Sequence, residues 1–389
     1  MENNIYCGRG YDLPYADFME LINICFNFTT PEQKFEGLLL KCYREEYRPQ
    51  DQNYVVIENG VATAAVGAYD HEITVCGRNI PCRGIGNVGV HPDHRSKGYM
   101  KMAMNKALED MKKDGIVLST LGGRRQRYQY FGFDKAGPQY VFTISRDNIR
   151  HVYGDFSSPY EVSLITDPAD AVIDDILRIS AKCPFNPVRP REKYLDIANS
   201  WKARLLVFTD PSDNGRFVGY CVMDKNNSLS EIRTDRDEDF MKAIRSVFAY
   251  LNEGFSINIP SFDIAYASAL SLIAEWHTYG SSMMYNILNY TKAIDAFMAL
   301  KLTYASLPDG KLTLKIHGFA GDETISIAVK NGAHTVEAVS GDTPADLELS
   351  HLEATELLFC TVSPAREIKD PLVRAWFPLP IYMYRADEV

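Results

Sequence analysis

The chain has 389 residues, which is more than one compact domain usually holds and predicts two or three domains. Hydrophobic residues make up 46% of it, the mean hydropathy is −0.21, and no stretch approaches the roughly twenty apolar residues of a membrane span. The formal net charge of −10 favours cationic partners over nucleic acid. These values exclude a membrane-spanning protein and argue against a nucleic-acid-binding one.

The chain start and the cysteines bear on location and metal content. Residues 1–4 lack the basic and apolar regions of a signal peptide, which predicts a cytoplasmic protein. The eight cysteines include no Cys-x-x-Cys pair, so neither a zinc site nor a disulfide framework is predicted. His91 and His94 have metal-like spacing, but no third ligand follows at a recognisable spacing. We therefore expect no metal.

The first elements predict a mixed α/β domain. Apolar spacing indicates a helix over residues 15–28, followed by a hairpin of residues 54–58 and 61–69 with Asn59-Gly60 as its turn. Further strands are expected over the ranges 72–75 and 80–85. This order of helix, meander and strand leads into the most informative stretch of the chain.

That stretch predicts a strand, a basic turn and a helix in succession. The strand covers 85–90, the turn covers 91–98, and the helix begins near Tyr99 with apolar residues at helical spacing on one face. Gly115 supplies a helix stop, and residues 116–121 resume as a strand. The unit is therefore strand, loop, helix, strand.

The turn is suited to an anion. The first amides of a helix are unpaired and carry the positive end of its dipole. Arg95 and Lys97 add charge beside Ser96, and Gly98 lets a ligand approach the backbone, so a pyrophosphate fits well. The alternative is an ordinary basic surface turn.

A resemblance follows from this turn together with the segment 122–133. Arg95-x-x-Gly98 resembles the coenzyme A pyrophosphate loop of the GNAT superfamily of N-acetyltransferases, although Met100 stands where that family has a second small residue. Phe131-Gly132-Phe133 resembles the aromatic-glycine-aromatic step that closes the acyl site there. Tyr128, three residues before Phe131, matches the family's proton donor to the leaving thiolate, whereas packing is expected for Tyr130.

The resemblance also implies a set of ligand contacts. Backbone groups of Val88 and Val90 would hold the pantetheine of acetyl-CoA. The pyrophosphate would bind the turn and the first helical amides, that is Arg95, Ser96, Lys97, Gly98, Tyr99 and Met100.

The second part of the chain repeats the first in outline. A hairpin of residues 204–209 and 217–223, a strand over 228–233 and an amphipathic helix from Phe240 to Leu251 are predicted. Residues 234–239 replace the basic turn with four carboxylates and no glycine. Because carboxylates repel a pyrophosphate, this copy is not expected to bind coenzyme A.

The last part predicts a separate module with a helix over 293–300, strands over 311–316, 324–330 and 334–338, and a helix over 352–359. Its pattern resembles the sterol carrier protein type 2 fold. The three parts together resemble the enhanced intracellular survival (Eis) family of GNAT acetyltransferases. We therefore expect an α/β (α+β) protein with an active GNAT domain (1–150), a degenerate GNAT-like domain (151–289) and a sterol-carrier-like domain (290–389).

The same resemblance gives Val389 a role, because enzymes of that family direct their C-terminal carboxylate into the active site. A carboxylate with a pKa of about 3.5 is a weak base, so it would take a proton through water or orient the amine. The proline-stiffened apolar tail, residues 376–384, suits a buried segment, and the alternative is a solvated tail. The resemblance further implies a homo-oligomer, a hexamer.

The expected function is acetyl transfer from acetyl-CoA to a primary amine of a cationic small molecule, of aminoglycoside or polyamine type, within a ternary complex. Two alternatives remain open. The chain could acetylate protein lysines or amino termini, or it could be a non-catalytic module that binds acyl-CoA or a lipid.

Overall fold

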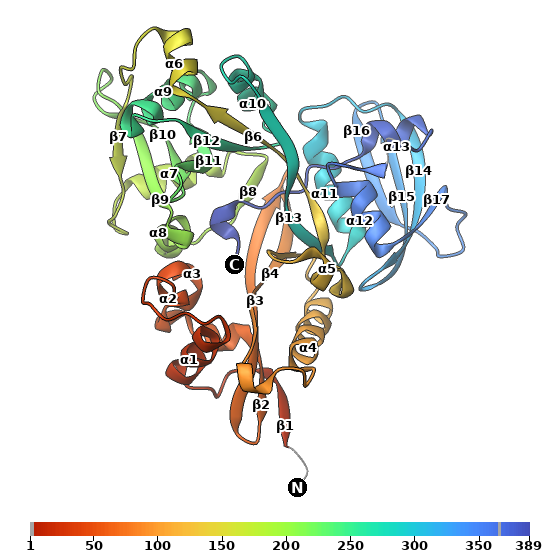
Figure 1. Ribbon diagram of the computed structural model, residues 1–389. Coiled ribbons are helices and arrows are strands. Elements are labelled where there is room, and N and C mark those ends of the chain that lie inside the picture. The colour runs from red at the N-terminus through yellow and green to blue at the C-terminus, as the bar shows by residue number, and fades with distance from the viewer. Residues whose placement is uncertain (1–3, 365–366) are drawn as a thin grey trace.

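The computed structural model describes residues 4–364 and 367–389, and it contains a 13-stranded mixed sheet and a separate four-stranded sheet (Figure 1). Residues 1–3, which contributed to the expectation of a chain without a signal peptide, lie outside the described residues. Across the described ranges, no helix is long and apolar enough to cross a membrane.

The first part of the large sheet carries most of the predicted N-terminal elements. Its strands are β1 (Ile5–Arg9), β2 (Asn53–Glu58), β3 (Val61–Val75), β4 (Arg78–Val90), β5 (Leu118–Leu121) and β6 (Asp134–Ile144). The accompanying helices are α1 (Tyr15–Cys25), α2 (Phe35–Leu38), α3 (Leu40–Tyr43), α4 (Tyr99–Lys113), α5 (Arg125–Tyr128) and α6 (Arg146–Tyr153). Short 3-10 turns are η1 (Glu45–Tyr47), η2 (Pro49–Gln52), η3 (Pro92–His94) and η4 (Gln129–Phe131).

The predicted helix after the basic turn is confirmed as α4. Its apolar face is buried against the sheet because these side chains recur at helical spacing: Tyr99, Ala103, Met104, Ala107, Leu108 and Met111. The first helix, α1, ends at Cys25, three residues earlier than predicted, because Asn27 has a left-handed φ of 56°.

Two predicted strand breaks are wrong. Residues 61–69 and 72–75 form one continuous strand, β3, and residues 80–85 and 85–90 form one continuous strand, β4. At the supposed break, Asp70 faces Arg83 on the neighbouring strand and accepts a hydrogen bond from its Nε at 2.5 Å. A cross-strand ion pair therefore lies where the strand was expected to be interrupted.

The middle part continues the same sheet. Its strands are β7 (Glu161–Leu164), β8 (Phe185–Pro187), β9 (Arg204–Asp210), β10 (Arg216–Met223), β11 (Ser228–Thr234), β12 (Phe255–Pro260) and β13 (His277–Ile287). Its helices are α7 (Val172–Ser180), α8 (Tyr194–Ala198), α9 (Phe240–Leu251) and α10 (Ile264–Ser271), with η5 (Arg191–Lys193), η6 (Ser200–Lys202) and η7 (Asp237–Asp239). As in β4-α4-β5, the unit β11-α9-β12 joins two parallel strands through a helix.

Strand order ties the two parts together. The order along the large sheet is β1-β2-β3-β4-β5-β13-β6-β12-β11-β10-β9-β7, and β8 pairs with β3. Strand β13, late in the chain, thus lies between β5 and β6. One sheet therefore spans both parts, and a division of the chain near residue 150 stays a prediction.

The C-terminal part packs helices against its own four-stranded sheet. Its elements are α11 (Tyr290–Leu302), β14 (Gly310–Gly318), β15 (Gly321–Lys330), β16 (Ala333–Ala338), β17 (Leu347–Ser350), α12 (His351–Phe359), α13 (Pro371–Trp376) and η9 (Arg385–Asp387), with sheet order β16-β15-β14-β17. The predicted strands and helices of this part are confirmed within a few residues at each end. After α13 the chain leaves this module and runs back across the large sheet (Figure 1).

Candidate active site

The site begins where β4 loses one of its two neighbours. Strand β4 pairs with β3 along its length, but it pairs with β5 only from Cys82↔Leu118 to Ile85↔Leu121. Residues 86–90 therefore have no strand partner on that edge within the part of the chain that the structure describes. Val88 and Val90 lie on this stretch, and their main chain faces a position that a ligand can pair with.

A bulge shapes this stretch of β4. The β3–β4 register shifts between Ala65 and Gly67, and Asn87 has a positive φ of 36°. The Asn87 Oδ1 accepts hydrogen bonds from the phenols of Tyr43 (2.7 Å) and Tyr69 (3.2 Å). Gly67 leaves room for this amide, because a β-carbon there would lie 2.2 Å from Asn87 Oδ1. The bulge is thus fixed by buried polar contacts that the sequence analysis did not identify.

The basic turn has the predicted geometry. Gly98 is the N-cap of α4 with φ 82°, and Ser96 also has a positive φ, 66°. None of the described residues has an atom within 4 Å of the position of a β-carbon on Gly98, so the helix start is open. The N–H groups of Tyr99 and Met100 have no intrahelical acceptor, because the first such bond of α4 runs from Met102 N–H to the carbonyl of Gly98.

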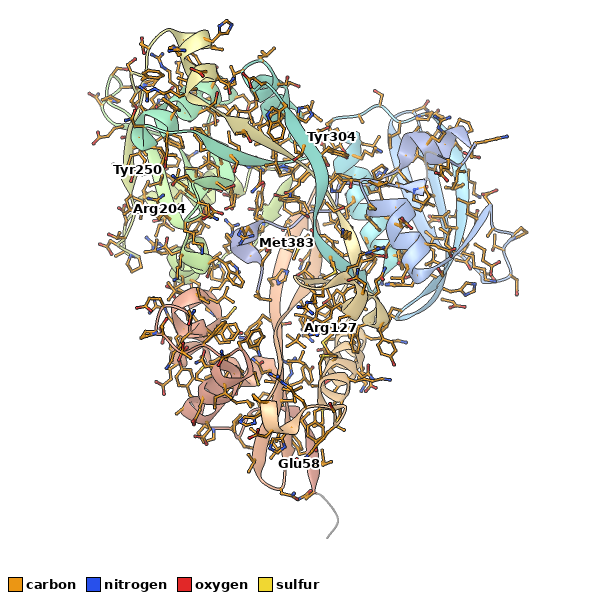
Figure 2. All side chains as sticks on the ribbon, in the orientation of Figure 1. Glu58, Arg127, Arg204, Tyr250, Tyr304 and Met383 are labelled. Atoms are coloured by element: carbon orange, nitrogen blue, oxygen red, sulfur yellow. The ribbon has the colours of Figure 1, made fainter. Side chains whose placement is uncertain are left out.

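The two basic side chains of the turn, Arg95 and Lys97, differ in whether they form an ion pair. Lys97 Nζ binds both Glu58 carboxylate oxygens, at 3.0 and 2.8 Å, and His94 Nδ1 lies 2.8 Å from the same carboxylate. Hydrogen bonds from Lys97 and Tyr99 lower the pKa of Glu58, at the end of β2, to about 2 (Figure 2). Arg95 is exposed and has no ion-pair partner among the described residues. Arg95 is therefore the cation left free for an anion.

Tyr128 belongs to the same hydrophobic cluster as Val88 and Val90 of the unpaired edge. It ends α5, is buried, and packs on Gly123, where a β-carbon would lie 2.9 Å from the ring. Burial raises the pKa of its phenol, which keeps the proton in place at neutral pH. Tyr130, for which we expected packing, is instead exposed and lies under Lys101, whose Nζ is 4.6 Å from the ring centre.

The aromatic-glycine-aromatic step contacts the C-terminal module. Phe131 and Phe133 are buried in the core beneath α4. His351 Nε2, at the start of α12, donates to the carbonyl of Gly132 at 2.8 Å, and Asn286 donates to the carbonyl of Phe131. A β-carbon on Gly132 would meet both donors. This step therefore links the first part of the chain to the last.

The C-terminus reaches the same region. The tail runs past Met383 between the parts of the molecule and ends beside β4 (Figures 1 and 2). Lys41 Nζ donates to the carbonyl of Ala386 at 2.5 Å, and Trp201 Nε1 donates to the carbonyl of Glu388 at 3.3 Å. The carboxyl carbon of Val389 lies 3.2 Å from the position of a β-carbon on Gly86. Val389 therefore sits on β4 at the point where the unpaired edge begins.

Two cavities flank the tail. One, of 440 Å³, is lined in part by Tyr69, His71 and Val389, and the other, of 590 Å³, is lined in part by Gly122, Gly123 and Glu388. Because Tyr128 packs on Gly123, the second cavity borders the loop that holds the phenol. The last residue, Val389, therefore borders the first cavity, and Glu388 borders the second.

The tail carboxylates have different environments. Burial alone would raise the pKa of Asp387, but Arg189 lowers it below its ordinary value. Burial raises the pKa of Glu388 to about 6. Burial also lowers the pKa of His71 to about 4 and that of Lys41 below its ordinary value. The sequence analysis named Val389, whose role stays a prediction, and did not identify Lys41 and Arg189, which contact the tail from distant positions.

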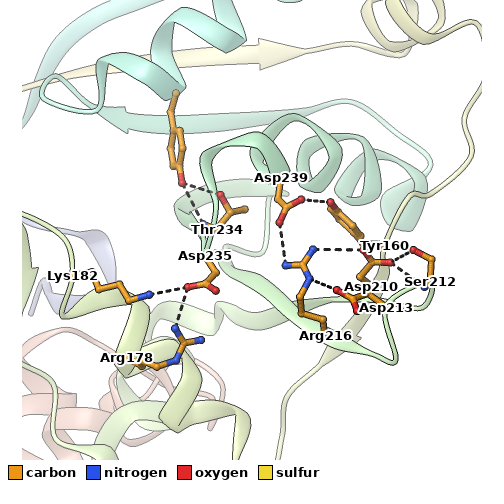
Figure 3. Close-up of polar contacts among 11 residues, drawn as sticks. Tyr160, Arg178, Lys182, Asp210, Ser212, Asp213, Arg216, Thr234, Asp235 and Asp239 are labelled. Atoms are coloured by element: carbon orange, nitrogen blue, oxygen red, sulfur yellow. Dashed lines mark hydrogen bonds and ion pairs between the residues drawn. The ribbon is translucent and has the colours of Figure 1, made fainter.

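The second copy of the strand-helix unit has a neutralised acidic turn (Figure 3). Asp235 accepts hydrogen bonds from Arg178 Nη1 at 3.0 Å and Lys182 Nζ at 3.1 Å, and Asp239 accepts one from Arg216 Nη1 at 3.2 Å. These carboxylates form ion pairs with nearby basic side chains. The turn therefore lacks the excess positive charge that the first copy has before α4. That this turn does not bind a pyrophosphate stays a prediction.

The comparisons with known proteins give the class of this site. Residues 14–136 match the family model of the acetyltransferase (GNAT) domain. This part of the chain is therefore a GNAT acetyltransferase domain, and such a domain implies an acyl-CoA co-substrate. No curated protein matches the chain at a significant level.

Solved structures extend the similarity to the whole chain. GCN5-related N-acetyltransferases from Anabaena variabilis (13% identity, 98% of each chain) and Kribbella flavida (15% identity, 100% of this chain and 99% of that one) both superpose with a TM-score of 0.69. Eis1 of Mycobacterium abscessus is 12% identical over 99% of this chain and 100% of its own, with a TM-score of 0.61. These similarities establish a shared GNAT-like fold, and the expected mixed α/β architecture is confirmed.

Proposed function

We propose that the chain is an acetyl-CoA-dependent N-acetyltransferase of the Eis type, acting on a primary amine of a cationic small molecule such as an aminoglycoside or a polyamine. In this proposal residues 1–150 are the active GNAT domain, residues 151–289 a degenerate copy and residues 290–389 a sterol-carrier-like module. The observation that carries it is the position of the Val389 carboxyl group on Gly86 of β4, beside the unpaired edge of residues 86–90.

The unpaired edge and the basic turn fit an acyl-CoA. The free edge of β4 supports pairing of the pantetheine amides with Val88 and Val90. The open helix start at Gly98 supports a pyrophosphate held by the amides of α4 and by Arg95. The full set of proposed contacts is Val88, Val90, Arg95, Ser96, Lys97, Gly98, Tyr99 and Met100.

The proposed transfer needs two proton movements. The amine nitrogen forms a bond to the thioester carbonyl carbon, and the carbon–sulfur bond breaks. Tyr128 gives its phenol proton to the departing thiolate, and the Val389 carboxylate accepts a proton from the amine through water. The buried, protonated phenol and the carboxyl group at Gly86 support these roles.

Charge near the tail supports a cationic acceptor. Glu388 lines the 590 Å³ cavity and has no Lys or Arg side chain within ion-pair distance among the described residues. Asp387 is neutralised by Arg189, so the free negative charges of the tail are Glu388 and the terminal carboxylate. Two such charges attract an ammonium ion and hold it beside the thioester.

The variant Tyr128→Phe tests whether the chain is an enzyme or a non-catalytic binding module. Because the variant lacks the proton donor, we expect kcat to fall about 100-fold or more while acetyl-CoA affinity stays unchanged. Tyr130→Phe is the matched control, since Tyr130 is an exposed tyrosine two residues away, and it should keep full activity. A Tyr128→Phe variant with wild-type turnover would overturn the assignment of Tyr128.

The acceptor class is tested by thiol release from acetyl-CoA with aminoglycosides, polyamines and lysine peptides, using protein with its native C-terminus. Turnover with the small cations supports the proposal, and turnover with peptides alone supports the protein acetyltransferase. Tight acetyl-CoA binding with no turnover in the panel would favour the non-catalytic module. The hexamer is a proposal from the same resemblance, and light scattering that gives a monomer would contradict it. The cytoplasmic location is a proposal from the sequence analysis of the first residues.

A further inference from the structure

We infer that Arg189 of the middle part is a positioning residue that sets the C-terminal carboxyl group on β4 by binding Asp387. The inference rests on the proposed function and deepens it, because it assigns the degenerate copy a task in the reaction. The task is to clamp the tail whose last residue, Val389, lies at the acyl-transfer site.

Arg189 lies between two buried carboxylates. Its Nε and Nη2 donate to Asp387 Oδ1 and Oδ2 at 2.9 and 2.7 Å, and its Nη1 and Nη2 donate to Glu231 Oε1 and Oε2 at 3.1 and 2.8 Å. The side chains of Arg189, Glu231 and Asp387 are 4%, 3% and 8% exposed. Both contacts are bidentate, which fixes the orientation of each carboxylate as well as its distance.

The two carboxylates come from different parts of the molecule. Glu231 belongs to β11 of the middle sheet, where Tyr220 also donates to it at 2.5 Å, so it is a fixed anchor. Asp387 belongs to η9, two residues before the C-terminus. Arg189 follows β8, the strand that pairs with β3. The guanidinium therefore joins the tail to elements already locked into the large sheet.

Arg189 binds a side chain of the tail close to its end, whereas Lys41 and Trp201 bind the tail backbone there. Lys41 and Trp201 donate to main-chain carbonyls of residues 386 and 388. The Arg189 guanidinium also lies 5.8 Å from the ring centre of Tyr384, which contacts Arg233 of the middle part as well. Only a short stretch of chain separates Asp387 from Val389, and each residue spans at most about 3.6 Å. The position of Asp387 therefore limits how far the carboxyl group can lie from β4.

The inference predicts that loosening Asp387 frees the C-terminus without disturbing the acyl-CoA site. Arg95 and the start of α4 lie on the first part of the sheet and make no hydrogen bond or ion pair with Arg189 or Asp387 among the interactions of the described residues. If Arg189 acted only on global stability, its substitution would loosen the whole fold and would not selectively free the last residue of the chain.

The test uses the full-length protein and the variants Asp387→Asn and Arg189→Lys, which keep side-chain size or charge but lose the bidentate ion pair. Carboxypeptidase release of the C-terminal valine reports tail docking directly. We expect at least tenfold faster release, about tenfold lower kcat and unchanged acetyl-CoA affinity for both variants. Asp235→Asn, which breaks an ion pair of the middle part away from the tail, is the matched control and should behave as wild type.

A variant that lacks Val389 provides the second part of the test. In a chain that ends at Glu388, Asp387→Asn should cause no further loss of kcat, because the group that it positions is gone. Unchanged valine release in both variants, or an equal loss of kcat from Asp387→Asn with and without Val389, would overturn the inference. If no amine is acetylated, the proposed function fails, yet the carboxypeptidase assay still decides whether Arg189 clamps the tail.

Discussion

The side chain of Val389 rests on Gly84. A β-carbon on Gly84 would lie 2.6 Å from Val389 Cγ2, and one on Gly86 would lie 3.4 Å from the same methyl. Because side chains alternate along a strand, these two glycines share one face of β4, and the last residue packs against that face. The strand thus lacks side chains where the C-terminus docks.

Gly84→Ala should therefore displace the C-terminus. A contact of 2.6 Å is shorter than carbon atoms tolerate, so Val389 must move away from β4. We expect kcat to fall about 10- to 100-fold, since a displacement of about 1 Å can cost that much, with little change in acetyl-CoA affinity. Steady-state kinetics and acetyl-CoA titration measure the two effects.

Gly341→Ala is the control for this substitution. Gly341 lies in the C-terminal module, and no atom of residues 4–364 or 367–389 lies within 4 Å of the position of its β-carbon. This variant should match wild type in both assays. Wild-type kcat in Gly84→Ala would mean that the tail position does not matter for turnover.

Much of the fold could be predicted because local patterns encode it. The six buried residues of α4 recur at helical spacing, and Gly98 precedes the helix where a left-handed residue is required. The break expected after Tyr69 was wrong for a physical reason. Asp70 resembles a turn residue in isolation, but its partner Arg83 lies opposite it on the next strand.

The tail contacts could not be predicted residue by residue, because they join positions far apart in the chain. Arg189 and Asp387 are separated by 198 residues, and Lys41 and Ala386 by 345. No local periodicity carries such a pairing. Alternating glycines at positions 84 and 86 were a usable signal, since a strand with two missing side chains on one face leaves space for another segment.

Arg95→Ala should weaken acetyl-CoA binding more than Lys97→Ala does. Arg95 is free, whereas Lys97 already donates to both oxygens of Glu58. A charge-assisted contact contributes about 1.5–3 kcal/mol, so we expect about a tenfold or larger rise in Kd for Arg95→Ala and a smaller one for Lys97→Ala. Isothermal titration calorimetry at two salt concentrations measures both, and the salt dependence should decrease in Arg95→Ala.

Lys113→Ala, at the other end of α4 and 69% exposed, controls for a general change of surface charge. It should bind acetyl-CoA as wild type does. Equal effects of the Arg95 and Lys97 substitutions would show that the pair with Glu58 does not occupy Lys97 during binding.

Glu388 should make acceptor binding depend on pH. Burial raises its pKa to about 6, so the carboxyl group is neutral below that pH and negative above it. The KM for a cationic acceptor should therefore fall, by about tenfold, as the pH rises from 5 to 7. In Glu388→Gln this part of the pH dependence should disappear. Glu238→Gln, an exposed carboxylate of the middle part, should leave the profile unchanged, and a persistent slope in Glu388→Gln would assign it to another group.

His71 should make the fold less stable in mild acid. Its Nε2 is buried with no hydrogen-bond partner among the described residues, and burial lowers the pKa of the ring from 6.5 to about 4. Between these values the unfolded chain binds a proton that the folded chain does not. Stability from this group is therefore complete above pH 6.5 and decreases as the pH falls toward 4, by at most about 3 kcal/mol.

His71→Gln tests this dependence, because the amide has no proton to gain. Asp387, Lys41 and Asp70 face the ring and remain in the variant, so their titration is common to both proteins. Urea unfolding from pH 4 to pH 7.5, followed by tryptophan fluorescence, should show a steeper loss of stability in wild type than in the variant. Parallel curves would mean that the His71 ring is protonated equally in the folded and unfolded chains, and that its buried nitrogen finds a partner in solution.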